Sequence, residues 1–416
     1  MSSASLFKQR SFTFLWWGQL LSITGDRLTY LALMGLLLEH SLRPDSPSFT
    51  TLLALFGNVV VAPVLLFAPF AGALIDRLDL KRVAVVADAL RAINVLAITL
   101  VYTVHPDVFA TFALVFTLFG LNVLFLPAKS ALIPAIVPAE QLLRANSHLA
   151  IAAIVATGVG ALAGGYIVDH YGWALAMQID AATYLISVFT LAMIPYAQDK
   201  AVSAKAPVGV RTYLAEVWDG WTELRHNAGV LTCVIALAAV WFAGGVLHVA
   251  GNPHVLTSAQ NLQQNPDQTM GMFQIGMLLC IIGIGTAVGT WWINTRGRRF
   301  SATSKLGGGL ILASGAIALF SSSTQLAILF AAGFLVGLFA APALILTETG
   351  LQQFATPQRR ARIFSGKDFL MRLTLLASVS STAWLVSFTG TTVTLWICAV
   401  VICAVGFTLL RRPLLD

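Results

Sequence analysis

Long apolar stretches separated by short polar segments run through the whole chain. Each stretch reaches or approaches the roughly 20 residues that a helix needs to cross the roughly 30 Å hydrocarbon core of a bilayer. A single strand could not satisfy its backbone groups in lipid, so every stretch is expected to be a helix. The pattern therefore predicts an all-α polytopic membrane protein with twelve transmembrane helices, at about 15–38, 51–75, 83–104, 108–128, 148–168, 173–196, 229–250, 270–293, 305–322, 326–347, 367–388 and 391–410.

The longest polar interval, residues 198–228, divides these spans into two sets of six. It predicts an N-terminal six-helix half at 1–197, a cytoplasmic linker at 198–228 and a C-terminal six-helix half at 229–416. Within the linker, apolar residues recur at helical spacing opposite charged ones, which predicts an amphipathic helix on the inner membrane surface. The interval 251–269 is rich in Asn, Gln and Pro, and we expect an outer connector or a lid there.

Composition and charge agree with a membrane protein. The chain is 57% hydrophobic and 10% charged, whereas a soluble domain carries about 25% charged residues. With the N-terminus in the cytoplasm, every Lys and Arg outside the spans except Arg43 falls on the cytoplasmic side. This asymmetry predicts that both termini lie in the cytoplasm, and it accounts for the net charge of +7 without nucleic acid. The sequence holds no Walker pattern, no metal-ligand spacing and no enzyme constellation, so we expect neither a cofactor nor an enzyme.

A charge-dense segment between the second and third spans begins at Gly72 and contains Asp76, Arg77, Lys81 and Arg82. A basic segment at 294–299 holds the equivalent place in the second half, with Asn in place of the acid. This pair of loops resembles the signature loop of the major facilitator superfamily. The resemblance implies two duplicated six-helix halves that rock around a site near the bilayer midplane.

Further motifs narrow the resemblance. Gly18-Gln19 with Gly25-Asp26 in the first span and Ala87–Arg91 in the third resemble the macrolide-efflux and siderophore-exporter branch of drug:proton antiporters. Bacterial lysophospholipid transporters share much of this pattern. The resemblance implies a monomeric, proton-coupled exporter of a hydrophobic or amphiphilic small molecule. A lysophospholipid flippase is the alternative, and a non-transporting scaffold or sensor with the same fold is a third hypothesis.

Ionisable residues inside the spans are the candidates for chemistry, because a charge near the bilayer centre costs several kcal/mol unless it faces a cavity or a partner. Asp26 lies about 12 residues into the first span, near the bilayer centre at 1.5 Å per residue. We expect Asp26 to be the coupling carboxylate and Arg27 to tune it or contact substrate; a permanent ion pair that fixes helix packing is the alternative. Asp180 stays open between substrate binding and packing. Further substrate candidates near the midplane are Tyr30, Asn122, Trp241 and Phe242.

A second group of charged residues is expected to gate transport. Asp88 and Arg91 stand three residues apart, so they can pair on one helix face as a brace. The resemblance implies that Asp76 meets the N-terminus of the eleventh span and latches the cytoplasmic side, since a helix N-terminus favours an anion. The charged residues expected around that latch are Arg77, Lys81, Arg82, Glu348, Lys367, Asp368 and Arg372.

The fifth span contains a run of small residues from Gly160 to Gly165 that includes Gly164. It resembles the antiporter motif GPxxGG, with Ala161 in place of Pro. Small residues let membrane helices approach closely, so we expect close packing here. The resemblance implies a hinge as the second possibility.

Overall fold

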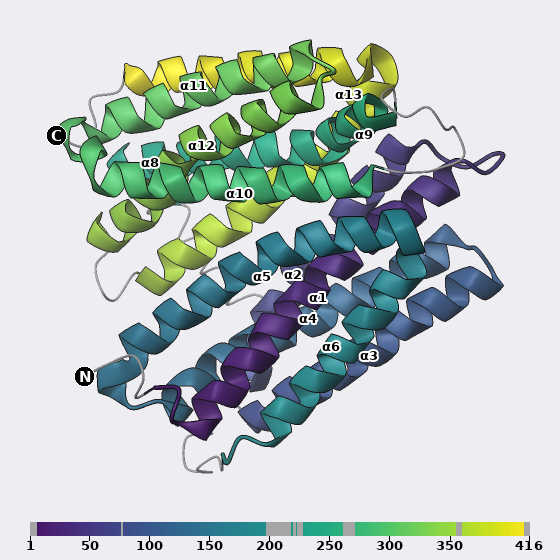
Figure 1. The fold of residues 1–416 in the computed structure, drawn as a ribbon. Helices are drawn as coiled ribbons and strands as arrows, with labels where there is room; N and C mark the ends of the chain where they lie inside the picture. Colours follow the sequence, from purple (N-terminus) through teal and green to yellow (C-terminus); the bar gives the residue numbers. More distant parts are fainter. Residues whose placement is uncertain are drawn as a thin grey trace. The chain divides into compact units, whose positions relative to one another are not determined.

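The computed structural model describes residues 6–75, 78–196, 218, 222, 228–260, 271–354 and 360–411. In these ranges the regular structure is helical and no strand occurs (Figure 1). The long helices of the first half of the chain are α1 (Arg10–Ser41), α2 (Phe49–Ile75), α3 (Leu80–Val104), α4 (Val108–Ile136), α5 (Leu142–Tyr171) and α6 (Trp173–Ala192). Those of the second half are α8 (Ala228–Val246), α9 (Asn252–Gln260), α10 (Met272–Asn294), α11 (Ala302–Ser322), α12 (Leu326–Phe354) and α13 (Arg360–Leu410).

Eleven helices among the described residues are long and apolar enough to cross a membrane. The range of α13 contains both of the last two predicted spans. Its backbone breaks between them at Gly390, which has a φ of 79°. Glycine adopts this left-handed conformation without steric cost. The predicted all-α membrane protein is therefore confirmed, and its last two spans follow each other across a one-residue kink.

Two boundaries differ from the sequence prediction. Helix α4 continues to Ile136 with Pro127 and Pro134 inside it. The interval from 251 to 260 is helical rather than a connector, because the π-helical turn η4 (Leu247–Gly251) leads directly into α9. The side-chain amide of Asn252 donates to the His248 carbonyl at 2.9 Å, so a polar residue supports this turn. Residues 261–270 lie outside the described residues.

The chain divides into two compact units. Unit 1 comprises Met1–Ser46 and Val59–Val210, and unit 2 comprises Pro47–Asn58 and Arg211–Asp416. The first ten residues of α2 therefore belong to unit 2, although in the sequence they lie between the two segments of unit 1. The predicted linker helix lies outside the described residues apart from 218 and 222, so its structure stays a prediction.

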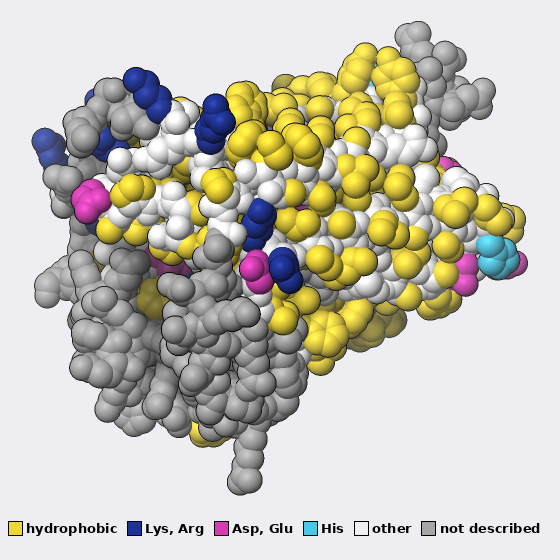
Figure 2. Space-filling view, turned by 90° about the horizontal axis from the view of Figure 1, so that it is seen from below, with side chains coloured by type: hydrophobic (Ala, Val, Ile, Leu, Met, Phe, Trp, Pro, Cys, Tyr) yellow, Lys and Arg dark blue, Asp and Glu magenta, His cyan; other side chains and the backbone are white. Residues whose placement is uncertain are grey.

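Helix α3 illustrates how the helices of unit 1 are oriented by polarity. Val86, Leu90 and Ile93 are exposed on one face, while Asp88 and Arg91 are buried on the other. This is the reverse of a helix in a soluble protein, and it suits an apolar solvent around a polar interior. Figure 2 shows the same tendency, with hydrophobic side chains spread over the right part of the view and the visible Lys and Arg side chains in its left part and centre.

Glycines allow backbone contact between particular helix pairs. A Cβ at Gly160 would lie 2.6 Å from the Thr24 carbonyl oxygen, so α5 can approach α1 only without a side chain at this position. In unit 2, Gly285 of α10 and Gly337 of α12 face each other's backbone with the same lack of space. Helix α5 itself runs unbroken from Leu142 to Tyr171. This geometry supports close packing by the Gly160–Gly165 run, and the hinge stays a prediction.

Candidate functional site

A cavity of about 120 Å³ lies among α1, α3, α4 and α6 of unit 1. We call it the polar cavity. It is lined by Asp26, Arg27, Thr29, Tyr30, Leu33, Arg91, Leu118, Phe119, Asn122 and Tyr184. Four of the predicted substrate residues, three from α1 and one from α4, therefore meet in one place, together with the predicted gating residue Arg91 of α3.

The charged centre of the polar cavity is Arg91. Its Nη2 donates to Asp26 Oδ1 at 2.6 Å and its Nη1 donates to Asp88 Oδ1 at 2.8 Å. Its Nη2 also donates to the Tyr184 hydroxyl at 2.9 Å, and that hydroxyl donates to Asp26. One guanidinium therefore holds two carboxylates from different helices. Asp88 receives a further hydrogen bond from Ser187 at 2.6 Å.

The two carboxylates on Arg91 differ in their access to the cavity. The Asp26 side chain is 34% exposed, whereas the Asp88 side chain is fully buried and Arg91 is 3% exposed. A buried ion pair persists only when each charge keeps its partner. Asp88 and Arg91 therefore form the fully buried pair, and Asp26 is the carboxylate that faces the cavity. Its role as the proton carrier stays a prediction.

Asp180 of α6 lies beside this network and does not line the cavity. Its carboxyl is fully buried and accepts hydrogen bonds from Thr29 of α1 and, at 3.0 Å, from Thr183. Gly25 makes this contact possible, because a Cβ at that position would collide with Asp180 and Thr183. The position supports a role in joining α1 to α6, and substrate binding by Asp180 stays a hypothesis.

Arg27 follows Asp26 in the sequence but has a different environment. No ion pair or hydrogen bond of Arg27 is found among the described residues, and its Nε is buried without an acceptor. Adjacent residues point about 100° apart on a helix. Asp26 therefore turns toward Arg91 rather than toward its neighbour. Arg27 also lines the cavity, and its contact with a substrate stays a prediction.

Sequence reasoning missed two residues of this region. Tyr184 stands one helical turn after Asp180 on α6, and this spacing is the signal that could have revealed it. Lys129 lies beyond the predicted end of the fourth span but is inside α4, where its Nζ donates to Gln19 Oε1 at 2.7 Å. The Lys129 ammonium also lies 5.7 Å from the centroid of the Phe125 ring.

The predicted gating residues fall into separate places. Asp76 and Arg77 lie outside the described residues. The Lys81 ammonium donates to the carbonyls of Ala192 and Ile194, both at 2.7 Å, and so covers the C-terminal end of α6. Cations at a helix C-terminus are stabilised by its unpaired carbonyls. Lys81 thus ties α3 to α6, whatever further role it has in gating.

The start of α3 is capped by a side chain of the charge-dense loop that precedes it. The Asp79 carboxylate accepts from the backbone N–H of Arg82 at 2.9 Å and caps the helix. Such a cap stabilises a helix by about 1 kcal/mol. The Arg82 side chain itself is exposed.

In unit 2, Lys367 is the buried centre of an acidic cluster. Its ammonium pairs with Glu348 of α12 and, at 3.2 Å, with Asp368. It also lies 5.0 Å from the centroid of the Phe364 ring. No ion pair of Arg372 is found among the described residues. Three of the predicted gating residues therefore meet, and their gating role stays a prediction.

The two aromatic candidates of unit 2 sit on α8 but do not share a site. Trp241 packs against the apolar core that includes Val234 and Leu237. Phe242 lines a cavity of about 130 Å³ together with Thr382 and other residues of α13. Trp241 therefore has the environment of a core residue.

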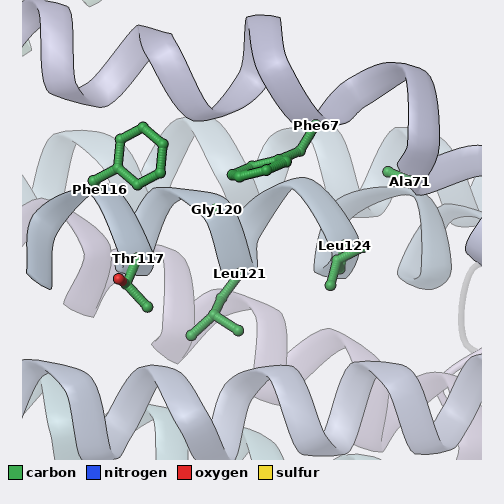
Figure 3. Close-up of a pocket in the computed structure, with 7 residues that line it drawn as sticks. All are labelled: Phe67, Ala71, Phe116, Thr117, Gly120, Leu121 and Leu124. Atoms are coloured by element: carbon green, nitrogen blue, oxygen red, sulfur yellow. The ribbon is translucent and has the colours of Figure 1, made fainter. Parts of the chain in front are cut away.

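A larger and apolar space lies between α2 and α4 of unit 1; we call it the apolar hollow. Its volume is about 380 Å³. Figure 3 shows Phe67 and Ala71 on α2 across from residues of α4. The α4 residues that line it are Phe116, Thr117, Gly120, Leu121 and Leu124.

Helices that cross the membrane and an ionisable network inside one unit define a multi-pass membrane transporter. Residues 15–365 match the family model of the Major Facilitator Superfamily, and the chain belongs to this family. The resemblance noted from the loop motifs is confirmed by this match.

Several curated proteins are similar to this chain. The protein assigned as the bacilysin exporter BacE of Bacillus amyloliquefaciens is 27% identical over 355 residues, which cover 85% of this chain and 83% of that protein. The lysophospholipid transporter LplT of Photorhabdus laumondii is 27% identical over 322 residues, which cover 76% of each chain. A crystal structure of the nucleoside transporter NupG has a TM-score of 0.70 at 15% identity and covers 96% of this chain and 98% of that one, which supports the fold alone.

Proposed function

We propose that this protein is a proton-coupled exporter of a hydrophobic or amphiphilic small molecule, working by alternating access as a monomer. It would reside in the bacterial inner membrane with both termini in the cytoplasm. The observation that carries the proposal is the position of Asp26, a partly exposed carboxylate that shares one arginine with a fully buried carboxylate.

The charge balance at Arg91 supports Asp26 as the proton carrier. When Asp26 takes up a proton, Arg91 keeps Asp88 as its counterion, so the buried pair remains neutral. When Asp26 releases the proton, its carboxylate regains Arg91 and the Tyr184 hydroxyl as donors. Both charge states of Asp26 therefore have partners, and neither requires unfolding of the network.

Relatives named as exporters favour the outward direction, and BacE, whose match covers 85% of this chain, is one example. A lysophospholipid flippase is the second candidate. It is favoured by the relative LplT and by the volume and apolar lining of the hollow between α2 and α4. A scaffold or sensor is disfavoured, because a protein that transports nothing gains nothing from a charged cavity inside the membrane.

The test is transport by proteoliposomes with and without an imposed pH gradient, with a macrolide or a lysophospholipid as the probe. Asp26→Asn mimics the protonated form permanently. We expect this variant to lose accumulation of the probe against its gradient while it retains binding and downhill exchange. Asp45→Asn is a matched control, because Asp45 is exposed in a loop and asparagine also tolerates its positive φ.

Two outcomes would contradict the assignment. If Asp26→Asn still concentrates the probe when the pH gradient is present, Asp26 does not carry the proton and Asp180 or Glu348 becomes the next candidate. If the variant loses folded protein rather than coupling, Asp26 is a structural brace on Arg91.

A further inference from the structure

The polar cavity and the apolar hollow of unit 1 differ in volume, and the volume limits the size of the ligand that each can bind. The polar cavity has about 120 Å³, which is room for several waters. Pockets for drug-sized ligands measure about 300–1,000 Å³. The apolar hollow, at about 380 Å³, reaches this range and the polar cavity does not.

The chemistry of the apolar hollow excludes a polar occupant. Thr117 is the one lining residue with a polar side chain, and its hydroxyl donates to the Ala113 carbonyl of its own helix at 3.0 Å. A polar group placed here would lose its hydrogen bonds to water and find no partner. The rings of Phe67 and Phe116 meet edge to face at 5.9 Å, so the wall suits hydrocarbon.

Gly120 keeps the apolar hollow open without being required by helix packing. A Cβ at Gly120 would lie 3.7 Å from the Phe67 ring and 3.9 Å from Pro63, which is ordinary van der Waals contact. At Gly160, by contrast, a Cβ would meet a backbone oxygen at 2.6 Å. The missing side chain at Gly120 therefore adds space rather than a closer helix contact.

The polar cavity and the apolar hollow lie on different faces of one helix. The polar cavity is lined by Leu118, Phe119 and Asn122 of α4. The hollow is lined by Phe116, Thr117, Gly120, Leu121 and Leu124 of the same helix. At about 100° per residue the centres of the two sets are roughly 180° apart. Helix α4 thus separates a site for protons and water from a site for apolar matter.

We infer that the apolar hollow binds the hydrocarbon portion of the transported amphiphile, while Asp26 exchanges its proton on the opposite face of α4. The inference rests on the proposed function and adds the substrate class, a molecule with an alkyl chain or a comparable aliphatic part. Helix α4 then lines both the apolar hollow and the polar cavity. A movement of α4 when substrate binds in the hollow would therefore also change the surroundings of Asp26.

The experiment fills the apolar hollow with a larger side chain and varies the length of the acyl chain on the probe. Gly120→Leu places a side chain between Phe67 and Pro63, and Gly120→Ala is its mild counterpart. Gly283→Leu is the matched control, because a Cβ at that helical glycine of α10 meets nothing within 4 Å. Proteoliposomes containing each full-length variant are assayed with short-chain and long-chain lysophospholipids.

We expect Gly120→Leu to reduce long-chain relative to short-chain transport by about tenfold, since lost apolar contacts change discrimination by at least that factor. Gly120→Ala and Gly283→Leu should retain the wild-type ratio. Equal loss for both chain lengths would overturn the inference. Unchanged transport of the long-chain probe by Gly120→Leu would overturn it as well.

Photolabelling separates substrate from bilayer lipid. A lysophospholipid with a photoactivatable chain should label the α2 and α4 peptides around Phe67 and Phe116, and unlabelled probe should displace it. Labelling by a photoactivatable bilayer phospholipid that the probe does not displace, or no labelling at all, would overturn the inference. If transport discriminates between acyl-chain lengths but does not respond to a pH gradient, proton coupling is rejected. The assignment of the apolar hollow as the acyl-chain site is then retained.

Discussion

The polar cavity and the apolar hollow share α4 but are built by opposite means. The polar cavity depends on charges that hold one another, since Arg91 contacts Asp26, Asp88 and Tyr184. The hollow depends on an absence, the missing side chain of Gly120, and on walls without free polar atoms. The difference teaches that polar spaces inside a membrane protein must be specified by partners, whereas apolar spaces need only be left unfilled.

The largest expected effect is a loss of stability when a single residue of the polar cavity, Arg91, is replaced. No single substitution in the apolar hollow should have a comparable effect. Arg91→Met leaves the fully buried Asp88 without its cation, and such a loss costs about 3–5 kcal/mol of stability. We expect little folded protein, measured by size-exclusion chromatography and thermal unfolding in detergent.

Adding Asp88→Asn to Arg91→Met provides the control, because it removes the uncompensated charge and should restore part of the stability. Thr117→Val in the apolar hollow should leave the unfolding temperature near that of the wild type. An Arg91→Met protein as stable as the wild type would show that the buried charge network does not hold unit 1 together.

A smaller effect distinguishes the two kinds of glycine. Gly160→Ala forces a methyl group against the Thr24 carbonyl, and overpacking of this kind typically costs about 1–3 kcal/mol. Gly120→Ala adds the same methyl group at ordinary contact distance and should leave the thermal unfolding temperature unchanged. Equal unfolding temperatures for the two variants would mean that α5 can move away from α1 at no cost.

The smallest expected effect tests the hydroxyl that Asp26 shares with Arg91. Tyr184→Phe removes one donor from Asp26 and keeps the ring that stacks 4.2 Å from the Arg91 guanidinium carbon. A hydrogen bond to a charged group contributes about 1.5–3 kcal/mol, but Asp26 keeps its contact with Arg91. We therefore expect normal folding and a change in the pH dependence of transport, measured as initial rates across a pH series. An unchanged pH profile would remove Tyr184 from the proton site.

Much of the architecture was predictable because its causes are local. Span length and hydropathy depend on neighbouring residues and on bilayer thickness, so α2, α3 and α11 begin and end close to their predicted bounds. The Asp88–Arg91 pair was predictable for the same reason, since helical geometry places residues three apart on one face. The helical interval from 251 to 260 was predicted wrongly, because its polar composition is typical of a loop.

The partners across helices could not be predicted from spacing. Asp26 pairs with Arg91, 65 positions away, rather than with adjacent Arg27. Lys129 was expected beyond the membrane span but bonds Gln19 from within α4. In each case the choice depends on which helices are neighbours and how they are rotated, and hydropathy is nearly the same all around such helices.

The sequence by itself determined the membrane class, the number and order of spans, the family and the positions of the unusual charges, because these follow from composition, periodicity and motif. Only the tertiary structure decided which charges share Arg91. It also decided which glycine allows close helix packing and which one lines the apolar hollow. Gly120 and Gly160 are the same residue in two apolar helices. They differ because the α1 backbone lies against Gly160, whereas a Cβ at Gly120 would meet only side chains at ordinary contact distance. The distance from a glycine to the neighbouring helix cannot be predicted from the local sequence, because the neighbouring helix comes from a distant part of the chain.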